Sequence, residues 1–257
     1  MKVMQTSQIF GFPILSVRKQ EFFDSLDSFF LENRRDKSLT LKIFTPNPEQ
    51  LVVATNDKIF SSNLSKANYL LPDGIGLVYA SKILSFFGKT KEKIKERIAG
   101  VEVVEHLLDL IKEQKLKALI IGGRDYSNAE DVEFSSNLFW TEGYQDKFEI
   151  LSTEEAVLTE KINELKPDLV FIAFGAPDQE NWIINHEKLL EENKVRIAMA
   201  VGGSFDFIFN RVKRAPVFVQ KLGFEWLWRL IKQPWRRHRQ LRLLSFIWLV
   251  IKEIFKR

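Results

Sequence analysis

Apolar runs that end in glycine corners are the feature of this sequence that most restricts its fold. One run extends from Asp168 to Phe174 before Gly175, another from Arg196 to Val201 before Gly202-Gly203, and a third from Lys117 to Ile121 before Gly122-Gly123. Strands buried on both faces of a parallel sheet have this composition. Helical periodicity follows the corners. The recurrence predicts an α/β fold with a Rossmann-like, mostly parallel sheet and helices on both faces.

The other elements are predicted from the same two periodicities. Further strands are expected at Leu39–Phe44, Tyr69–Leu71 and Phe148–Leu151, a hairpin within Met4–Val17, and helices at Glu21–Asn33, Val101–Leu116, Asn128–Leu138, Thr153–Leu165, Val217–Ile231 and Arg236–Phe255. Thr153 is the expected cap of its helix, followed by two acidic residues in the first turn.

Charge divides the chain into two unequal parts. Residues 211–257 hold 13 basic and 2 acidic residues, a net charge of +11, whereas residues 1–210 hold 25 basic and 32 acidic residues, a net charge of −7. We therefore expect an α/β domain over 1–210 and a basic, Trp-rich helical appendage over 211–257. Such a tail calls for an anionic partner.

The end of the tail has the pattern of a helix that lies in a membrane surface. Its apolar run, Leu243–Ile251, is far shorter than the ~20 residues that span a bilayer. Basic residues flank the run, including Arg236 and Arg237 before it, as in interfacial helices. Two alternatives stay open: a tail that binds nucleic acid through phosphates and base stacking, and a homo-oligomer in which the helix packs on another subunit. Long aliphatic residues favour lipid over bases, so we expect no nucleic-acid partner.

The absence of cysteine restricts both chemistry and compartment. It excludes disulfides, thiolate catalysis and Cys-ligated zinc. No secretion signal is expected at the N-terminus. We expect a cytoplasmic protein that is peripherally attached to the inner face of the plasma membrane.

Asp73 is the candidate catalytic carboxylate. It lies in Leu70-Leu71-Pro72-Asp73-Gly74-Ile75-Gly76, between a short strand and a helical pattern. This position is the carboxyl edge of the sheet, where open α/β proteins bind ligands. A carboxylate there can take a proton from an attacking hydroxyl. The competing interpretation is a helix cap, and these residues alone do not decide between the two. A dinucleotide fingerprint is disfavoured, because Tyr79 stands where the third glycine belongs.

Two further segments carry candidate ligand-binding groups. Thr45-Pro46-Asn47-Pro48 forms a second strand-to-helix corner, with Asn47 as a favourable N-cap and Pro48 at the first helical position. Its hydroxyl, amide and free N–H groups favour an anion, although the cap alone explains Asn47. Arg97 precedes the small pair Ala99-Gly100 and can face a phosphate.

Several blocks, taken in order, resemble one known family. They are Thr45–Glu49, Pro72–Gly76, Glu96–Gly100, Gly175–Pro177 with Gln179-Glu180, Gly202–Asp206, Lys213–Pro216, Leu222–Trp226 and Arg229–Arg236. Each block is weak alone, but the ordered set is specific. From about Ile9 to Arg236 the chain is similar to the WecG/TagA/CpsF family of bacterial cell-envelope glycosyltransferases.

The resemblance implies an inverting transferase that moves a hexosamine-type sugar from a UDP donor to a sugar on a polyprenyl diphosphate. The implied sugar is N-acetylmannosamine or its uronic acid, for cell-envelope polysaccharide or teichoic acid synthesis; another UDP-hexose such as glucose is the alternative. Asp73 matches the family's proposed base, and Thr45, Asn47, Arg97 and Gln179 match residues that line its donor site. The appendage matches a part that docks on the membrane, so Arg214, Arg229, Trp235, Arg236 and Arg237 are expected at the acceptor diphosphate or the membrane.

No metal or other cofactor is expected. The three histidines have no metal-ligand spacing, and the Asp-x-Asp pair common among sugar transferases is missing near the glycine corners. The leaving diphosphate would then be stabilised by arginines and backbone N–H groups. The candidates are Arg97, Arg214, Gly122, Gly123, Gly175, Gly202 and Gly203.

Two positions are less defined. Asp178 stands where relatives often carry a lysine, and the segment after Arg236 extends beyond the usual family ending. Asp206 can orient the acceptor or brace its own loop, and the structural interpretation is favoured.

Overall fold

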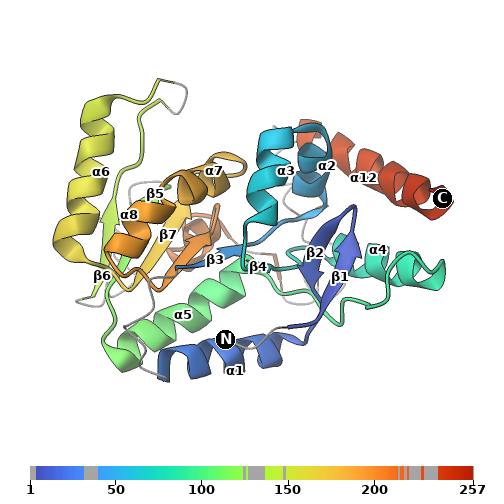
Figure 1. The fold of residues 1–257 in the computed structure, drawn as a ribbon, viewed down its shortest axis with the longest axis horizontal. Helices are drawn as coiled ribbons and strands as arrows, with labels where there is room; N and C mark the ends of the chain where they lie inside the picture. The colour runs from blue at the N-terminus through green and yellow to red at the C-terminus, as the bar shows by residue number, and fades with distance from the viewer. Residues whose placement is uncertain are drawn as a thin grey trace.

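The sheet has eight strands and is parallel except for the hairpin at one edge. The computed structural model describes residues 4–31, 40–123, 126, 137–146, 149–213, 215, 216, 219, 227, 228 and 237–256. Within these residues the strands are β1 (Thr6–Ile9), β2 (Phe12–Leu15), β3 (Leu41–Phe44), β4 (Tyr69–Leu70), β5 (Ala118–Gly122), β6 (Leu138–Thr141), β7 (Leu169–Ala173) and β8 (Ile197–Ala200). Their order is β1-β2-β4-β3-β8-β7-β5-β6, and only β1 and β2 pair antiparallel (Figure 1).

Helices cover both faces of the sheet, as predicted. They are α1 (Lys19–Leu31), α2 (Pro48–Asn56), α3 (Lys58–Ser65), α4 (Ile75–Phe86), α5 (Gly100–Gln114), α6 (Ser152–Leu165), α7 (Asp178–Asn185), α8 (Glu187–Glu192), α9 (Ser204–Ile208) and α12 (Arg237–Phe255). Helices α1, α5 and α9 share one apolar core, and α2, α3, α4, α6, α7, α8 and α12 share the other. Figure 1 shows α1 and α5 below the sheet and α2, α3 and α7 above it.

Strand β7 shows why the apolar runs are continuous. Val170 and Ile172 point into one core, whereas Leu169 and Phe171 point into the other, and all four are fully buried. Because successive side chains of a strand point to opposite faces, a strand covered on both sides needs apolar residues throughout. The predicted fold class is confirmed.

The far edge of the sheet differs from the prediction. Residues 149–151 are not a strand, and the edge strand is instead β6, so Leu138 begins a strand rather than ending a helix. The aromatic pair Phe139-Trp140 suits this strand, which pairs with β5, and Trp140 Nε1 donates to the Gly122 carbonyl at 3.0 Å. The rest of the predicted 128–138 helix and Phe148 lie outside the described residues. Helix α6 begins at Ser152, so Thr153 lies inside the helix rather than capping it.

The second tail helix is present and packs on the body. Helix α12 contacts α2 and α4, with Phe246 and Val250 buried in the core that those helices share. The Phe246 ring meets the Phe10 ring edge-on at 5.5 Å. None of the helices described is long and apolar enough to cross a bilayer. The first predicted tail helix, 217–231, lies mostly outside the described residues, and the division at residue 210 stays a prediction.

Candidate active site

Asp73 lies where predicted, between β4 and the start of α4. Its N–H donates to the Pro46 carbonyl at 3.1 Å, which ties this corner to the one after β3. Gly74 follows with φ of +137°, a conformation that other residues rarely adopt. Gly74 is the N-cap of helix α4, so Asp73 lies one residue before the cap, and its role as catalytic base stays a prediction. The Asp73 side chain is 34% exposed, which leaves it accessible to a ligand.

Two glycines let this corner pack closely on Pro48. A Cβ atom at Gly74 would lie 3.0 Å from Pro48 Cδ, and one at Gly76 would lie 2.8 Å from Pro48 Cγ. Both distances are too short for an ordinary carbon contact. The corners after β3 and β4 therefore form one rigid unit, and the positions of Asp73 and Asn47 depend on each other.

Arg97 reaches the same place from a distant segment. The Ile98 N–H donates to the Pro72 carbonyl at 3.1 Å, which fixes the chain beside the Asp73 corner. Arg97 Nε then lies 3.7 Å from Asp73 Oδ1. This ion pair sets a cation next to the candidate base, and contact of Arg97 with a phosphate stays a prediction.

Thr45 joins the end of β3 to β8 and α5. Its hydroxyl donates to the Ala200 carbonyl at 3.3 Å. A Cβ atom at Gly100 would lie 3.3 Å from Thr45 Oγ1, so the first residue of α5 sits directly against this side chain. The N-termini of α2, α4 and α5 thus surround one corner, and their N–H groups favour an anionic ligand.

Asn47 caps α2 as predicted, with Pro48 as the first helical residue. The Gln50 N–H donates to Asn47 Oδ1 at 3.0 Å, and the Asn47 N–H donates to Gln50 Oε1 at 2.9 Å. The cap uses the carboxamide oxygen and leaves the Nδ2 amino group out of this exchange. Contact between this amino group and the nucleotide-sugar donor stays a prediction.

Gln179 bridges two of the predicted glycine corners. Its Oε1 accepts hydrogen bonds from the Gly175 N–H at 3.2 Å and the Gly202 N–H at 2.9 Å. The side chain is buried, and both glycines have positive φ, +81° and +52°. These two N–H groups therefore hold the ends of β7 and β8 together. Contact of Gln179, Gly175, Gly202 or Gly203 with the nucleotide-sugar donor stays a prediction.

Glu180 was not among the predicted site residues. It is buried beside Gln179, whose Nε2 donates to Glu180 Oε1 at 2.9 Å. Glu180 Oε2 has no hydrogen-bond partner among the residues described. Burial raises the pKa of the Glu180 carboxyl to about 7, although the hydrogen bond from Gln179 lowers it. Because the Gln179 amino group is held by Glu180, its oxygen is directed to the two glycine N–H groups. The sequence contains the Gln179-Glu180 motif, but it does not indicate that both side chains are buried.

Packing explains the two glycines at the end of β5. A Cβ atom at Gly122 would lie 2.5 Å from Phe174 Cδ1, and one at Gly123 would lie 2.6 Å from the Tyr126 hydroxyl oxygen. The Tyr126 hydroxyl donates to Asp206 Oδ1 at 3.1 Å, which fits a bracing role for Asp206. Tyr126 was not among the predicted site residues. Contact of these two glycines with the nucleotide-sugar donor stays a prediction.

The structure brings Asp73, Arg97, Thr45 and Asn47 together, with the Gln179 bridge joined to them through β8. Arg214, Arg229, Trp235 and Arg236 lie outside the described residues, and Arg237 begins α12 with a side chain that is not described. Among the described residues no group of three or more His, Asp or Glu side chains could hold a metal ion.

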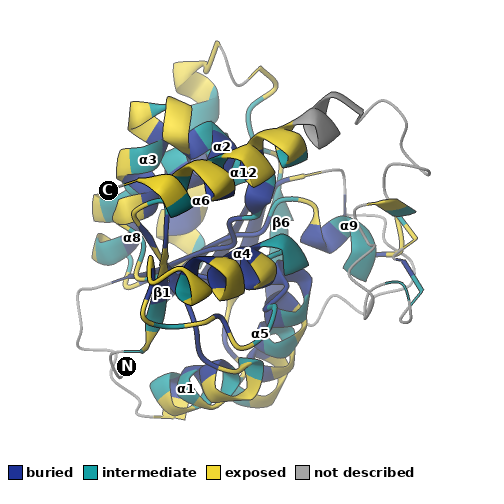
Figure 2. Cartoon of the chain, turned by 90° about the vertical axis from the view of Figure 1, so that its right-hand side faces the viewer, coloured by how far each residue is buried: buried dark blue, intermediate teal, exposed yellow. Residues whose placement is uncertain are grey.

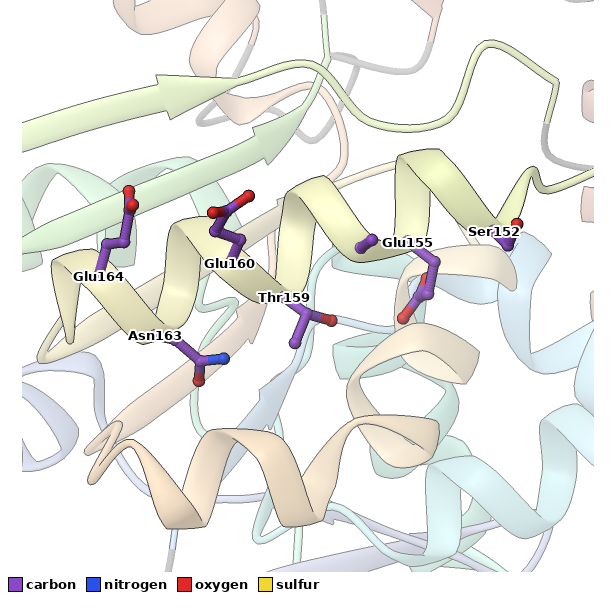
Figure 3. Close-up of a pocket in the computed structure, with 7 residues that line it drawn as sticks. Ser152, Glu155, Thr159, Glu160, Asn163 and Glu164 are labelled. Carbon is purple, nitrogen blue, oxygen red and sulfur yellow. The ribbon is translucent and has the colours of Figure 1, made fainter.

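A groove runs along α6, as Figure 3 shows. Three of its lining residues are Glu155, Glu160 and Glu164. Helix α6 lies at the β6 end of the sheet, whereas Asp73 follows β4 near the other end (Figure 1). Like charges repel an anionic ligand from this groove, so the corner around Asp73 is the better candidate site.

Known proteins resemble the chain over nearly its whole length. The sequence model described as "Glycosyl transferase WecG/TagA/CpsF family" matches residues 7–257. A Bacillus subtilis (strain 168) protein named N-acetylglucosaminyldiphosphoundecaprenol N-acetyl-beta-D-mannosaminyltransferase is 32% identical, over 97% of this chain and 93% of that protein. A protein of the same name from Bacillus spizizenii is 30% identical over 97% of this chain and 92% of that protein. Another, from Staphylococcus aureus (strain MRSA252), is 27% identical over 86% of this chain and 82% of that protein.

Proposed function

Because the chain belongs to the WecG/TagA/CpsF family of glycosyltransferases, we propose that it transfers N-acetylmannosamine from a UDP donor to the N-acetylglucosamine of a diphospho-undecaprenol acceptor. The names of the relatives support this pair of substrates. The ion pair of Asp73 and Arg97, at the point where three helix N-termini meet, is the observation that carries the proposal.

The geometry supports a single displacement with inversion. A hydroxyl oxygen of the acceptor sugar attacks the anomeric carbon of the donor, on the face opposite the UDP group. Asp73 takes the hydroxyl proton as the new C–O bond forms. The bond between the anomeric carbon and UDP breaks, and the electron pair leaves with the diphosphate. Arg97 and the N-termini of α2, α4 and α5 offset the negative charge that develops there.

Helix α12 attaches this enzyme to the membrane that holds its acceptor. Its outer face exposes Leu244, Ile247, Trp248, Ile251 and Phe255. The basic residues Arg242 and Lys252 lie on the same helix, and Lys256 follows its last residue. Apolar and basic residues combined in this way bind the headgroup region of an anionic bilayer. We place this surface at the inner face of the plasma membrane.

The first test is a turnover assay with a water-soluble, short-chain analogue of the acceptor. UDP-N-acetylmannosamine, its uronic acid, UDP-N-acetylglucosamine and UDP-glucose are supplied separately, with EDTA present. We expect transfer from UDP-N-acetylmannosamine that EDTA does not abolish, and a fall of about 100-fold or more in Asp73→Asn, because the amide cannot accept the proton.

Asp57→Asn is the matched control. Asp57 caps α3 by accepting from the Ile59 and Phe60 N–H groups, and asparagine also caps helices, so its activity should stay unchanged. Normal turnover in Asp73→Asn would overturn the role of Asp73 as base. Transfer from UDP-glucose alone would overturn the proposed donor, and loss of turnover with EDTA would overturn the expectation of a metal-independent enzyme.

A further inference from the structure

Helix α4 is apolar on two opposite faces. Leu77 and Leu84 are buried against the body, whereas Tyr79, Ile83 and Phe86 are exposed at 54%, 44% and 83%. Spacings of four and three residues set these three side chains on one stripe of the helix. A helix that is apolar all round is normally buried, yet α4 lies at the surface (Figure 2).

The stripe ends in a pair of phenylalanines. The rings of Phe86 and Phe87 meet edge-on with centroids 5.2 Å apart, and Phe87 is itself 51% exposed. Isolated exposed apolar residues are ordinary on protein surfaces, but a contiguous apolar patch marks an interaction site. This end of α4 is therefore the part of the helix that most needs a partner.

The stripe on α4 lies beside the exposed stripe on α12. The two helices contact each other. Lys89, just after α4, donates from Nζ to the main-chain carbonyl of Lys256, just after α12, so the ends of the two helices lie together. Figure 2 shows the exposed surfaces of both helices on the same side of the molecule. We call this combined surface the docking face; Tyr79, Ile83, Phe86 and Phe87 form its α4 half, and Trp248 and Phe255 belong to its α12 half.

Charge identifies the occupant of the docking face. Residues 79–93 contain four lysines and one glutamate, whereas residues 1–210 as a whole carry a net charge of −7. The Lys82 ammonium lies 5.9 Å from the centre of the Tyr79 ring, directly beside the apolar stripe. Lysines around exposed aromatic residues match the interface of an anionic bilayer. In a pair of copies joined face to face, the same lysines would repel one another.

We propose that α4 is the second half of the membrane-docking surface, and that Phe86 and Phe87 insert into the headgroup region of an anionic bilayer next to α12. The inference rests on the proposed function, which brings the enzyme to a lipid-linked acceptor. It adds a catalytic-domain helix to an attachment otherwise assigned to the basic tail.

The test is co-sedimentation of the full-length protein with vesicles of phosphatidylglycerol and phosphatidylcholine, at low and high salt. The double variant Phe86→Ser/Phe87→Ser should lose affinity for these vesicles by about tenfold or more, since each ring contributes apolar contact. Binding should also weaken with salt. The matched control is Leu151→Ser/Val157→Ser. It changes two apolar residues that are 57% and 55% exposed, at the α6 end of the molecule and away from the docking face. Turnover with the water-soluble acceptor should stay normal in all variants.

The outcomes separate this inference from the proposed function. If the Phe86/Phe87 variant binds like wild type while Trp248→Ser/Phe255→Ser loses binding, α12 docks alone and the inference is wrong. A wild-type dimer that the Phe86/Phe87 variant converts to a monomer, with vesicle binding unchanged, would make the face a contact between copies and overturn it too. If the wild-type protein showed no turnover with the soluble acceptor, that result would instead contradict the proposed function itself.

Discussion

At the scale of single residues, Glu180 shows how burial changes the chemistry of a side chain. Its native pKa is about 7, above the ordinary value of 4.5, so the folded protein holds a proton that the unfolded chain releases. Stability should therefore fall as pH rises from about 4.5 to about 7 and level off above that. The same linkage means that the carboxyl costs stability at pH 8, by at most about 3 kcal/mol.

Glu180→Gln tests this expectation. The amide can still accept from Gln179, but it does not titrate. We expect the variant to be more stable than wild type at pH 8 and close to it at pH 5, as measured by urea unfolding at both values. Glu160→Gln, on the exposed side of α6, is the control and should follow wild type at both pH values. If the free energy of unfolding changed equally between pH 5 and pH 8 in Glu180→Gln and wild type, the raised pKa of the Glu180 carboxyl would be contradicted.

At the scale of elements, the contact between α4 and Pro48 decides the geometry of the candidate site. Alanine is ordinarily more stable than glycine within a helix, by roughly 1 kcal/mol. At Gly76, however, the added Cβ would lie 2.8 Å from Pro48 Cγ. We expect Gly76→Ala to destabilise the protein by about 1–3 kcal/mol and to lower turnover, because α4 moves and Asp73 moves with it.

Thermal unfolding and the soluble-acceptor assay check this expectation. Ser85→Ala, later in the same helix and half-buried, is the control and should change stability by no more than about 0.5 kcal/mol. A Gly76→Ala protein that is stabilised and fully active would show that the corner tolerates a side chain.

At the scale of the whole molecule, α12 belongs to the same apolar core as the helices that start at the candidate site. Phe246 is buried in this core, and it lies near Gly76 as well as Phe10. Phe246→Ala should cost about 3 kcal/mol or more and release α12 from the body. Hydrogen exchange over residues 242–256 would detect that release.

Phe255→Ala is the control for this prediction. The side chain is 79% exposed, so its removal should change stability by less than about 0.5 kcal/mol. If Phe246→Ala left the exchange of α12 unchanged, the helix would be held by other contacts than its buried face.

The amino-acid sequence by itself determined the fold class of this protein and much of its local structure. Continuous apolar runs can persist only in strands covered on both faces, so they specified the parallel sheet. Local chemistry also specified the Asn47 cap with Pro48, because such caps depend on neighbours within one turn. Element assignment was wrong at the β6 edge, where an aromatic segment became a strand by pairing with β5.

Only the tertiary structure decided which groups meet. Arg97 is 24 positions after Asp73 in the chain, and nothing local specifies their 3.7 Å approach. Gln179 bridges two corners, and Glu180 is buried behind it, because strands β7 and β8 are neighbours in the sheet. The shared docking face of α4 and α12 likewise arises from packing between distant segments. Periodicity follows from local geometry and is written along the chain, whereas contacts across the sheet depend on strand order and on the side chains that fill the space between elements.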